Sequence, residues 1–196
     1  MLAEWGAECA GEDPVVVVPW RDEQGTARFI DLRTNPYDLY LIAEAEEHPA
    51  LLQALRALNA GRSPVFTAKC DVWAMAGEEL EALRLNLDAD AESAHAGFAS
   101  YIDAVWRERA VAASRHRQEQ ILDRVVRVAG AVEAPLAALE CVLRPAVIDL
   151  EDTFEGYAIT LYVKAAGSDG EHARAEWGHA LGEVVKLLRG REFAGR

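Results

Sequence analysis

The sequence predicts one α+β domain over residues 1–196, with about five strands in a mainly antiparallel sheet and helices packed on one face. Segments rich in β-forming residues come in pairs joined by short polar connections, which favours antiparallel pairing. The helical patterns are grouped between these pairs instead of alternating with single strands, which distinguishes α+β from doubly wound folds. A chain of this length buries a sizeable core without disulfides or metal.

The first strand pair is predicted at residues 14–20, "PVVVVPW", and 27–33, "ARFIDLR". Valine, isoleucine and aromatic residues favour strands, and the intervening "RDEQGT" supplies polar turn residues that include Gly25. We therefore expect these two segments to form a hairpin.

Two short helices are predicted next, within residues 35–61. Pro49 fits the first turn of the second helix, and Asn59 and Gly61 are suited to end it. A further helix is predicted at residues 77–90, because three leucines between Leu80 and Leu87 fall on one helical face.

A long helical segment is predicted near residues 91–129. An unbroken helix of that length would extend about 58 Å, whereas a compact domain of this size is about 42 Å across. The segment must therefore break, with Gly97 as a weak break point, or protrude. A protruding helix would have an apolar end to cover and would favour a homodimer; the alternative is two packed helices.

Two more strands and a C-terminal helix are predicted in the last third of the chain. The strands are residues 138–150 and 156–167, and their five-residue connection suits an antiparallel pair. Residues 171–190 have the apolar spacing of an amphipathic helix.

Residues 64–75, "PVFTAKCDVWAM", predict a strand with charged residues in its middle. Side chains alternate across a strand, so Phe66, Ala68, Cys70, Val72 and Ala74 are expected on one face and Thr67, Lys69, Asp71 and Trp73 on the other. Cys70 is therefore expected to point into the core, where a thiol is usually inert.

The same alternation in the two C-terminal strands collects polar side chains on one predicted face. Its members, which are also the candidate ligand-binding residues, are Lys69, Asp71, Trp73, Glu140, Arg144, Tyr162 and Lys164, with Asp31 or Arg33 as possible additions.

Two interpretations of this predicted face stay open. It is either a solvated sheet surface with cross-strand ion pairs or a surface on which charged and aromatic side chains bind a small polar ligand. The chain has only three lysines, and two of them, Lys69 and Lys164, belong to the predicted face. This placement favours the binding interpretation, since an ammonium differs from a guanidinium in geometry and in how readily its pKa shifts.

Charge and composition narrow the classes of partner. The net charge of −13 and the lack of a dense Lys/Arg run argue against nucleic acid. No apolar run is long enough to span a membrane, and the first residues lack the pattern of a signal peptide. Three cysteines without CxxC spacing fit reduced thiols, so a cytoplasmic location is expected.

No motif assigns catalytic residues, a cofactor or a metal. Two Glu-x-x-His spacings, Glu92 with His95 and Glu176 with His179, could share a metal on a helix, but a di-iron site needs carboxylates from two further bundle helices. The sequence therefore favours a binding or protein-interaction module. The alternative is a small-molecule enzyme with Lys69, Asp71 and Glu140 as acid and base groups.

Overall fold

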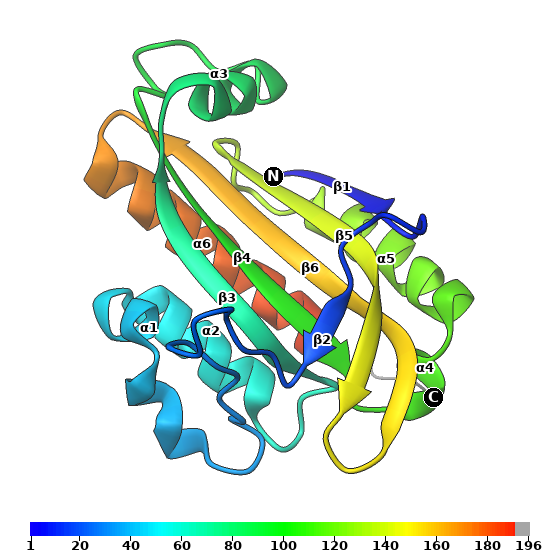
Figure 1. Ribbon diagram of the computed structural model, residues 1–196. Helices are drawn as coiled ribbons and strands as arrows, with labels where there is room; N and C mark the ends of the chain where they lie inside the picture. Colours follow the sequence, from blue (N-terminus) through cyan, green and yellow to red (C-terminus); the bar gives the residue numbers. More distant parts are fainter. Residues whose placement is uncertain (191–196) are drawn as a thin grey trace.

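A six-stranded mixed sheet organises the computed structural model, which describes residues 1–190 (Figure 1). The strands follow the order β1–β5–β6–β4–β3, and β2 also pairs with β5. They are β1 (Leu2–Ala7), β2 (Val16–Val18), β3 (Val65–Met75), β4 (Ala96–Trp106), β5 (Ala137–Asp149) and β6 (Thr153–Gly167). The pairings among β5, β6, β4 and β3 are antiparallel, whereas β1 and β2 both run parallel to β5. The α+β class is confirmed, but the sheet is mixed.

The predicted N-terminal hairpin is wrong. Within residues 14–20 only β2 is a strand, and it pairs with residues 146–148 of β5. The turn itself forms, because the backbone N–H of Asp22 donates to the carbonyl of Ala27 at 3.0 Å. After the turn, the single bridge between Arg21 and Arg28 is not extended into a strand. The physical reason is burial: Val18 is fully buried when β2 lies along β5.

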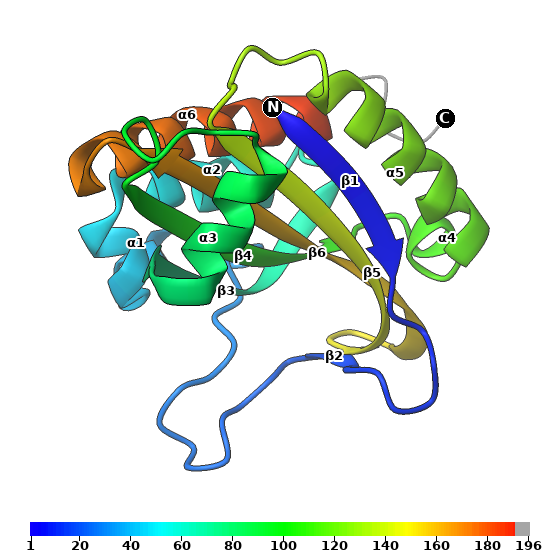
Figure 2. The ribbon, with the colours of Figure 1, turned by 90° about the horizontal axis from the view of Figure 1, so that it is seen from above.

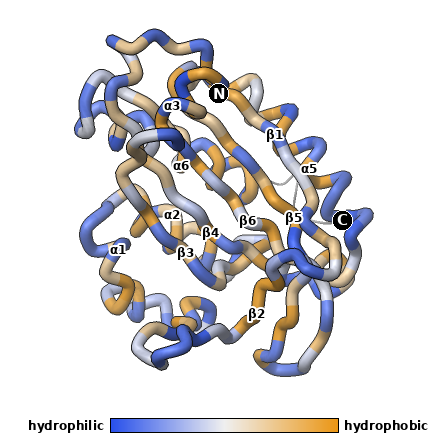
Figure 3. The backbone as a smooth tube through the Cα atoms, turned by 45° about the horizontal axis from the view of Figure 1, so that its top comes forward, coloured by the Kyte–Doolittle hydropathy of each residue, from blue (hydrophilic) through white to orange (hydrophobic). Residues whose placement is uncertain are grey.

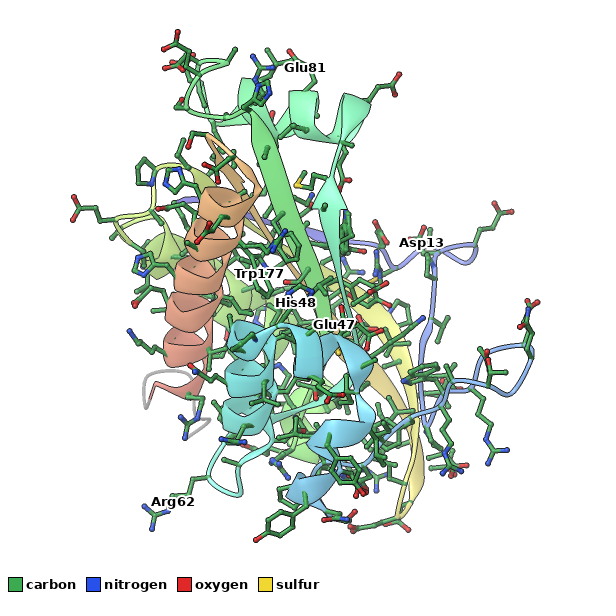
Figure 4. All side chains as sticks on the ribbon, turned by 90° about the vertical axis from the view of Figure 1, so that its left-hand side faces the viewer. Asp13, Glu47, His48, Arg62, Glu81 and Trp177 are labelled. Carbon is green, nitrogen blue, oxygen red and sulfur yellow. The ribbon has the colours of Figure 1, made fainter. Side chains whose placement is uncertain are left out.

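Three helices cover one face of the sheet: α2 (Pro49–Asn59), α5 (Arg115–Ala129) and α6 (Gly170–Arg189) (Figure 2). The main core lies between them and the sheet. Trp177 of α6 fixes this layer, because its indole N–H donates to the buried Ser100 hydroxyl of β4 at 2.9 Å. The ring of His48, at the start of α2, lies 6.1 Å from the Trp177 ring (Figure 4). The remaining short helical pieces are η1 (Pro36–Leu41), α1 (Ala43–Glu47) and α4 (Arg109–Ala112). Among the helices described, none combines the length and apolar character needed to cross a membrane.

Helix α3 (Gly77–Asn86) is an exception to the prediction that helices occupy one face. It packs on the opposite face, which we call the front face, where Leu83 joins a small apolar cluster with Met75, Ala99 and Ala138. Alanines leave room for a helix above the sheet at this end. The front face is therefore covered at the end of the sheet near α3.

The predicted long helical segment near residues 91–129 is also wrong. Its first part is β4, followed by the short α4 and by α5. Strand β4 lies between β3 and β6, and every residue in it except Ala96 and Tyr101 is buried. A strand that is buried on both faces has no polar–apolar alternation. Because alanine has a high helix propensity, the alanine-rich sequence of β4 therefore resembles that of a helix. Because α5 packs against β1 and β5, the unpartnered helix that motivated a homodimer does not exist.

Residues 8–35, hereafter the strap, connect β1 with η1 and run along the front face (Figure 2). In Figure 3 the valines of β2 form an apolar stretch within it. Val16 and Val18 pack on Phe66 and Val105 of the sheet. Further along, the Trp20 indole N–H donates to the Ala68 carbonyl at 2.8 Å. The strap therefore covers the end of the front face opposite to α3.

Candidate functional site

Strand register places the predicted polar side chains in three rows across the front face. The row nearest α3 is Trp73–Ala99–Lys164–Ala138, the middle row is Asp71–Tyr101–Tyr162–Glu140, and the row nearest the strap is Lys69–Asp103–Thr160–Val142. Arg144 follows two residues after Val142 on β5. We call the polar and aromatic members of this arrangement the polar face: Lys69, Asp71, Trp73, Tyr101, Asp103, Glu140, Arg144, Thr160, Tyr162 and Lys164. All seven predicted residues belong to it.

A β-bulge corrects the predicted alternation in the first part of β3. The register with β4 shifts between Thr67 and Lys69, so Phe66 and Ala68 point to the front face instead of sharing the face of Cys70. Thr67 faces the helix layer, where its N–H donates to Asn59 Oδ1 at 3.0 Å. An inserted residue reverses the side-chain parity on one side of a bulge. The assignments from Lys69 onward are unaffected.

Cys70 packs against the main core, as the alternation predicts. Burial raises the pKa of its thiol to about 12. A thiol with such a pKa is almost entirely protonated at neutral pH and is a weak nucleophile. The structure therefore gives Cys70 a packing role.

Three aromatic rings form the floor of the polar face. The Trp73 and Tyr101 centroids are 6.4 Å apart, and the Tyr101 and Tyr162 centroids are 6.1 Å apart. The ammonium of Lys69 lies 6.0 Å from the Tyr101 centroid, and that of Lys164 lies 5.4 Å from the Tyr162 centroid. All three rings are partly exposed. Neighbouring rings are tilted by 52° and 51° to each other, and they present an accessible aromatic surface with one cation beside Tyr101 and another beside Tyr162.

Ion pairs fix several of the charged side chains. Lys164 Nζ donates to Glu140 at 2.8 Å. The Arg144 guanidinium pairs with Glu8 of the strap at 2.8 Å and donates to the Thr160 hydroxyl at 3.0 Å. By contrast, Lys69 and Asp71 are exposed at the β3 edge. The polar face therefore combines charges held in place with charges accessible to a ligand.

Asp103 is a buried carboxylate within the polar face that sequence reasoning missed. It is 8% exposed, and its Oδ1 accepts from the Thr160 hydroxyl at 2.6 Å. Burial raises the pKa of Asp103, while the Thr160 hydrogen bond and the positive charges of Arg144 and Lys69 act in the opposite direction. Asp103 and Tyr101 were missed because β4 was interpreted as a helix. The β-forming residues around Tyr101 in "GFASYIDAVW" are the signal that could have found them.

Burial also raises the pKa of Tyr101, assisted by the nearby carboxylates of Asp103 and Asp71. The Tyr101 hydroxyl therefore stays protonated at neutral pH and is available to a ligand as a hydrogen-bond donor.

Two cavities adjoin the polar face at different places. A cavity of about 120 Å³ beneath α3 is lined by Glu140, Lys164 and Glu79, among others. A larger one of about 670 Å³ lies beside Lys69, between the strap and the edge of β3. Asp31 and Arg33, the possible additions to the predicted face, lie outside the three rows and pair with each other at 2.9 Å.

The Glu-x-x-His spacings do not assemble a metal site in the part of the chain described. Glu92 and His95 lie in a turn before β4 and not on a helix. Glu176 of α6 approaches His172 at 3.5 Å. Within residues 1–190 no three His, Cys, Asp or Glu side chains converge on one point as metal ligands.

Comparison of the sequence with models of known protein families gave no match. Searches of curated proteins and of solved structures likewise gave no significant match.

Proposed function

We propose that the protein is a binding module and that a small polar ligand lies across the polar face. The observation that carries this proposal is the accessible run of three neighbouring rings, Trp73, Tyr101 and Tyr162, hereafter the aromatic row, which crosses two of the register rows and is flanked by charges of both signs. Aromatic rings offer a large contact area at low cost in side-chain entropy. A few charged groups beside such a surface fix the orientation of a ligand.

The order of charges across the rows indicates which hydrogen-bonding groups the ligand should carry. The middle row ends in two carboxylates, Asp71 and Glu140, and the outer rows carry the ammonium groups of Lys69 and Lys164. A ligand with both donors and acceptors matches this pattern. The ion pair between Lys164 and Glu140 holds both side chains before binding, which lowers the entropic cost of association.

An enzyme that uses Lys69, Asp71 and Glu140 as acid and base groups receives less support. Glu140 is engaged by Lys164, and Lys69 and Asp71 are exposed to solvent. Catalytic acids and bases are usually desolvated so that their pKa values match the reaction. A cytoplasmic location stays a prediction.

A thermal-shift screen with polar metabolites tests the proposal. A ligand at about 100 times its Kd stabilises the folded state by about 2.7 kcal/mol, which raises the Tm of a chain of this size by about 5–10 °C. We expect the shift to disappear in the Lys69→Met, Lys164→Met double variant and to weaken in Lys164→Met alone. Lys186→Met is a matched control, because this third lysine is an exposed residue of α6 paired with Glu183.

The outcomes separate the alternatives. A shift that is unchanged in Lys164→Met and lost in Lys69→Met would place the ligand beside the β3 edge and not on the polar face. The absence of any shift across a broad set of metabolites would favour the solvated interpretation of the face.

A further inference from the structure

The larger cavity, hereafter the β3-edge cavity, has the size of a ligand site. Its volume of about 670 Å³ lies within the range of about 300–1,000 Å³ found for small-molecule pockets. Its walls come from the strap, from η1 and α1, and from residues 67–70 of β3. The cavity is thus built from segments that are distant in sequence and is separate from the aromatic row.

Trp20 joins the strap wall to the sheet wall. Its indole N–H donates to the Ala68 carbonyl, which lies at the β-bulge on the edge strand. The ring of Trp20 also lies 5.0 Å from the Lys69 ammonium. Trp20 therefore holds the strap over the β3 edge and places an aromatic surface beside a cation.

Polar and apolar groups contribute about equally to the surface of the cavity. Leu32 and Leu55 are almost fully buried behind it, with 2% and 1% exposure. Ile42 lines the wall formed by η1 and α1. The apolar part of this surface favours a ligand with an apolar body over a fully hydrated one.

Three cations and two carboxylates that line the cavity make no ion pair among the residues described. Within residues 1–190, Arg21, Arg28 and Lys69 make no ion pair with a carboxylate. The carboxylate of Asp31, in contrast, accepts two hydrogen bonds from the Arg33 guanidinium. In a chain with 33 acidic and 20 basic residues, three such cations around one cavity favour an anion.

Two further lining carboxylates belong to η1 and α1. Asp38 Oδ1 already accepts from the Asn35 amide at 2.7 Å. Glu44 lies in the first turn of α1 and is partly exposed. Because these carboxylates belong to η1 and α1, the anionic group of a ligand should lie on the side of Arg21, Arg28 and Lys69.

We infer that the β3-edge cavity binds an organic anion with a flat apolar body, such as an aromatic carboxylate. The body would lie against Trp20 and Ile42, and the carboxylate would face Lys69 and the two arginines. This inference does not depend on the proposed function, since it uses a different cavity and shares only Lys69 with the polar face.

Three probes with one body and different charges test the inference: 2-naphthoate, 2-naphthamide and 2-naphthylmethylammonium. Binding is followed through the indole N–H signals of the ¹⁵N-labelled protein, with Trp20 as the reporter. We expect naphthoate to shift the Trp20 signal and to bind about tenfold more tightly than the amide, because several partly exposed ion pairs add small increments. We expect the ammonium probe to bind more weakly than the amide.

Paired variants locate the anionic end. Arg21→Gln with Arg28→Gln should weaken naphthoate binding about fivefold, or about twofold for each arginine, and the effect should shrink as salt rises from about 0.02 M to about 0.3 M. Both arginines are exposed, so the variant should keep the fold, which its thermal unfolding checks. Glu44→Gln, which neutralises a lining carboxylate of α1, should leave naphthoate binding unchanged or stronger. Lys164→Met should have no effect.

Three results would overturn the inference: equal binding of all three probes, tightest binding of the ammonium probe, or naphthoate affinity unchanged by loss of both arginines. Failure of naphthoate to shift Trp20 at millimolar concentration would overturn it as well. None of these results bears on ligand binding at the polar face, which Lys164→Met tests separately.

Discussion

Replacing Arg144 by methionine should destabilise the protein more than a typical surface change. The guanidinium pairs with Glu8 at 2.8 Å and donates to Thr160 at 3.0 Å, so it joins the strap to the polar face. Its side chain is 15% exposed, and that of Glu8 is 44% exposed. Methionine keeps the length of the stem and removes the charge and both contacts.

The expected magnitude follows from these contacts. A half-exposed ion pair contributes about 0.5–1 kcal/mol, and the hydrogen bond to a buried hydroxyl contributes about 1 kcal/mol. Loss of the positive charge also makes the buried Asp103 carboxylate less favourable, since Arg144 lowers the pKa of Asp103. We expect a loss of about 2 kcal/mol and a fall in Tm of about 4–8 °C for a chain of this size.

Urea denaturation followed by circular dichroism measures the change. Arg117→Met is the matched control, because its contact with Glu108 is 3.8 Å long and both side chains are about half exposed. The control should lie within about 0.5 kcal/mol of the wild type. If Arg144→Met also lies within that range, the polar face is not held together by Arg144 and the reasoning fails.

Three further predictions concern pH, thiol reactivity and close packing. Asp103→Asn should remove a fall in stability that begins as pH rises above the ordinary pKa of an Asp carboxyl, because a buried carboxyl with a raised pKa favours the folded state while protonated and loses this contribution as pH rises through its folded-state pKa. In the folded protein at about pH 8, iodoacetamide should label Cys9 before Cys70, since burial raises the pKa of Cys70 to about 12. Gly167→Ala should destabilise by about 3 kcal/mol or more in urea denaturation, because a Cβ there would lie 2.8 Å from the His172 carbonyl carbon, in rigid backbone.

Each of these has a contrary outcome. The first would be contradicted by parallel stability–pH curves for the wild type and Asp103→Asn. Rapid labelling of Cys70 in the folded state would show that its thiol is not packed against the core. A Gly167→Ala protein as stable as Gly6→Ala, whose added Cβ meets no atom within 4 Å, would refute the close approach of β6 to α6.

The alternation of polar and apolar residues predicted the strands that have one polar and one apolar face. The C-terminal strands and the part of β3 after Lys69 alternate clearly, so the seven predicted residues do share one face. The alternation pattern did not predict β4, because this strand is buried on both sides. Without β4, Tyr101 and Asp103 were absent from the predicted face. The aromatic row was therefore predicted without its central ring.

The local sequence pattern could not predict which distant strands pair with each other. Strand β2 pairs with β5, which lies about 130 residues later in the chain, and no turn residue next to β2 indicates this partner. The β-bulge at Ala68 likewise depends on the register with β4 and on the contact between Thr67 and Asn59. The β3-edge cavity could not be predicted, because its walls meet only after the strap has crossed the sheet.

The most direct test of the central proposal is the indole N–H spectrum of the ¹⁵N-labelled protein during titration with the first metabolite that raises its Tm. Trp73 belongs to the polar face and donates to Glu79 at 3.0 Å, whereas Trp177 donates to Ser100 within the core. If the polar face binds the ligand, the Trp73 signal should move with a saturable dependence on concentration while the Trp177 signal stays in place. Saturable binding that leaves Trp73 unchanged, in the wild type and in Lys164→Met alike, would contradict the proposal.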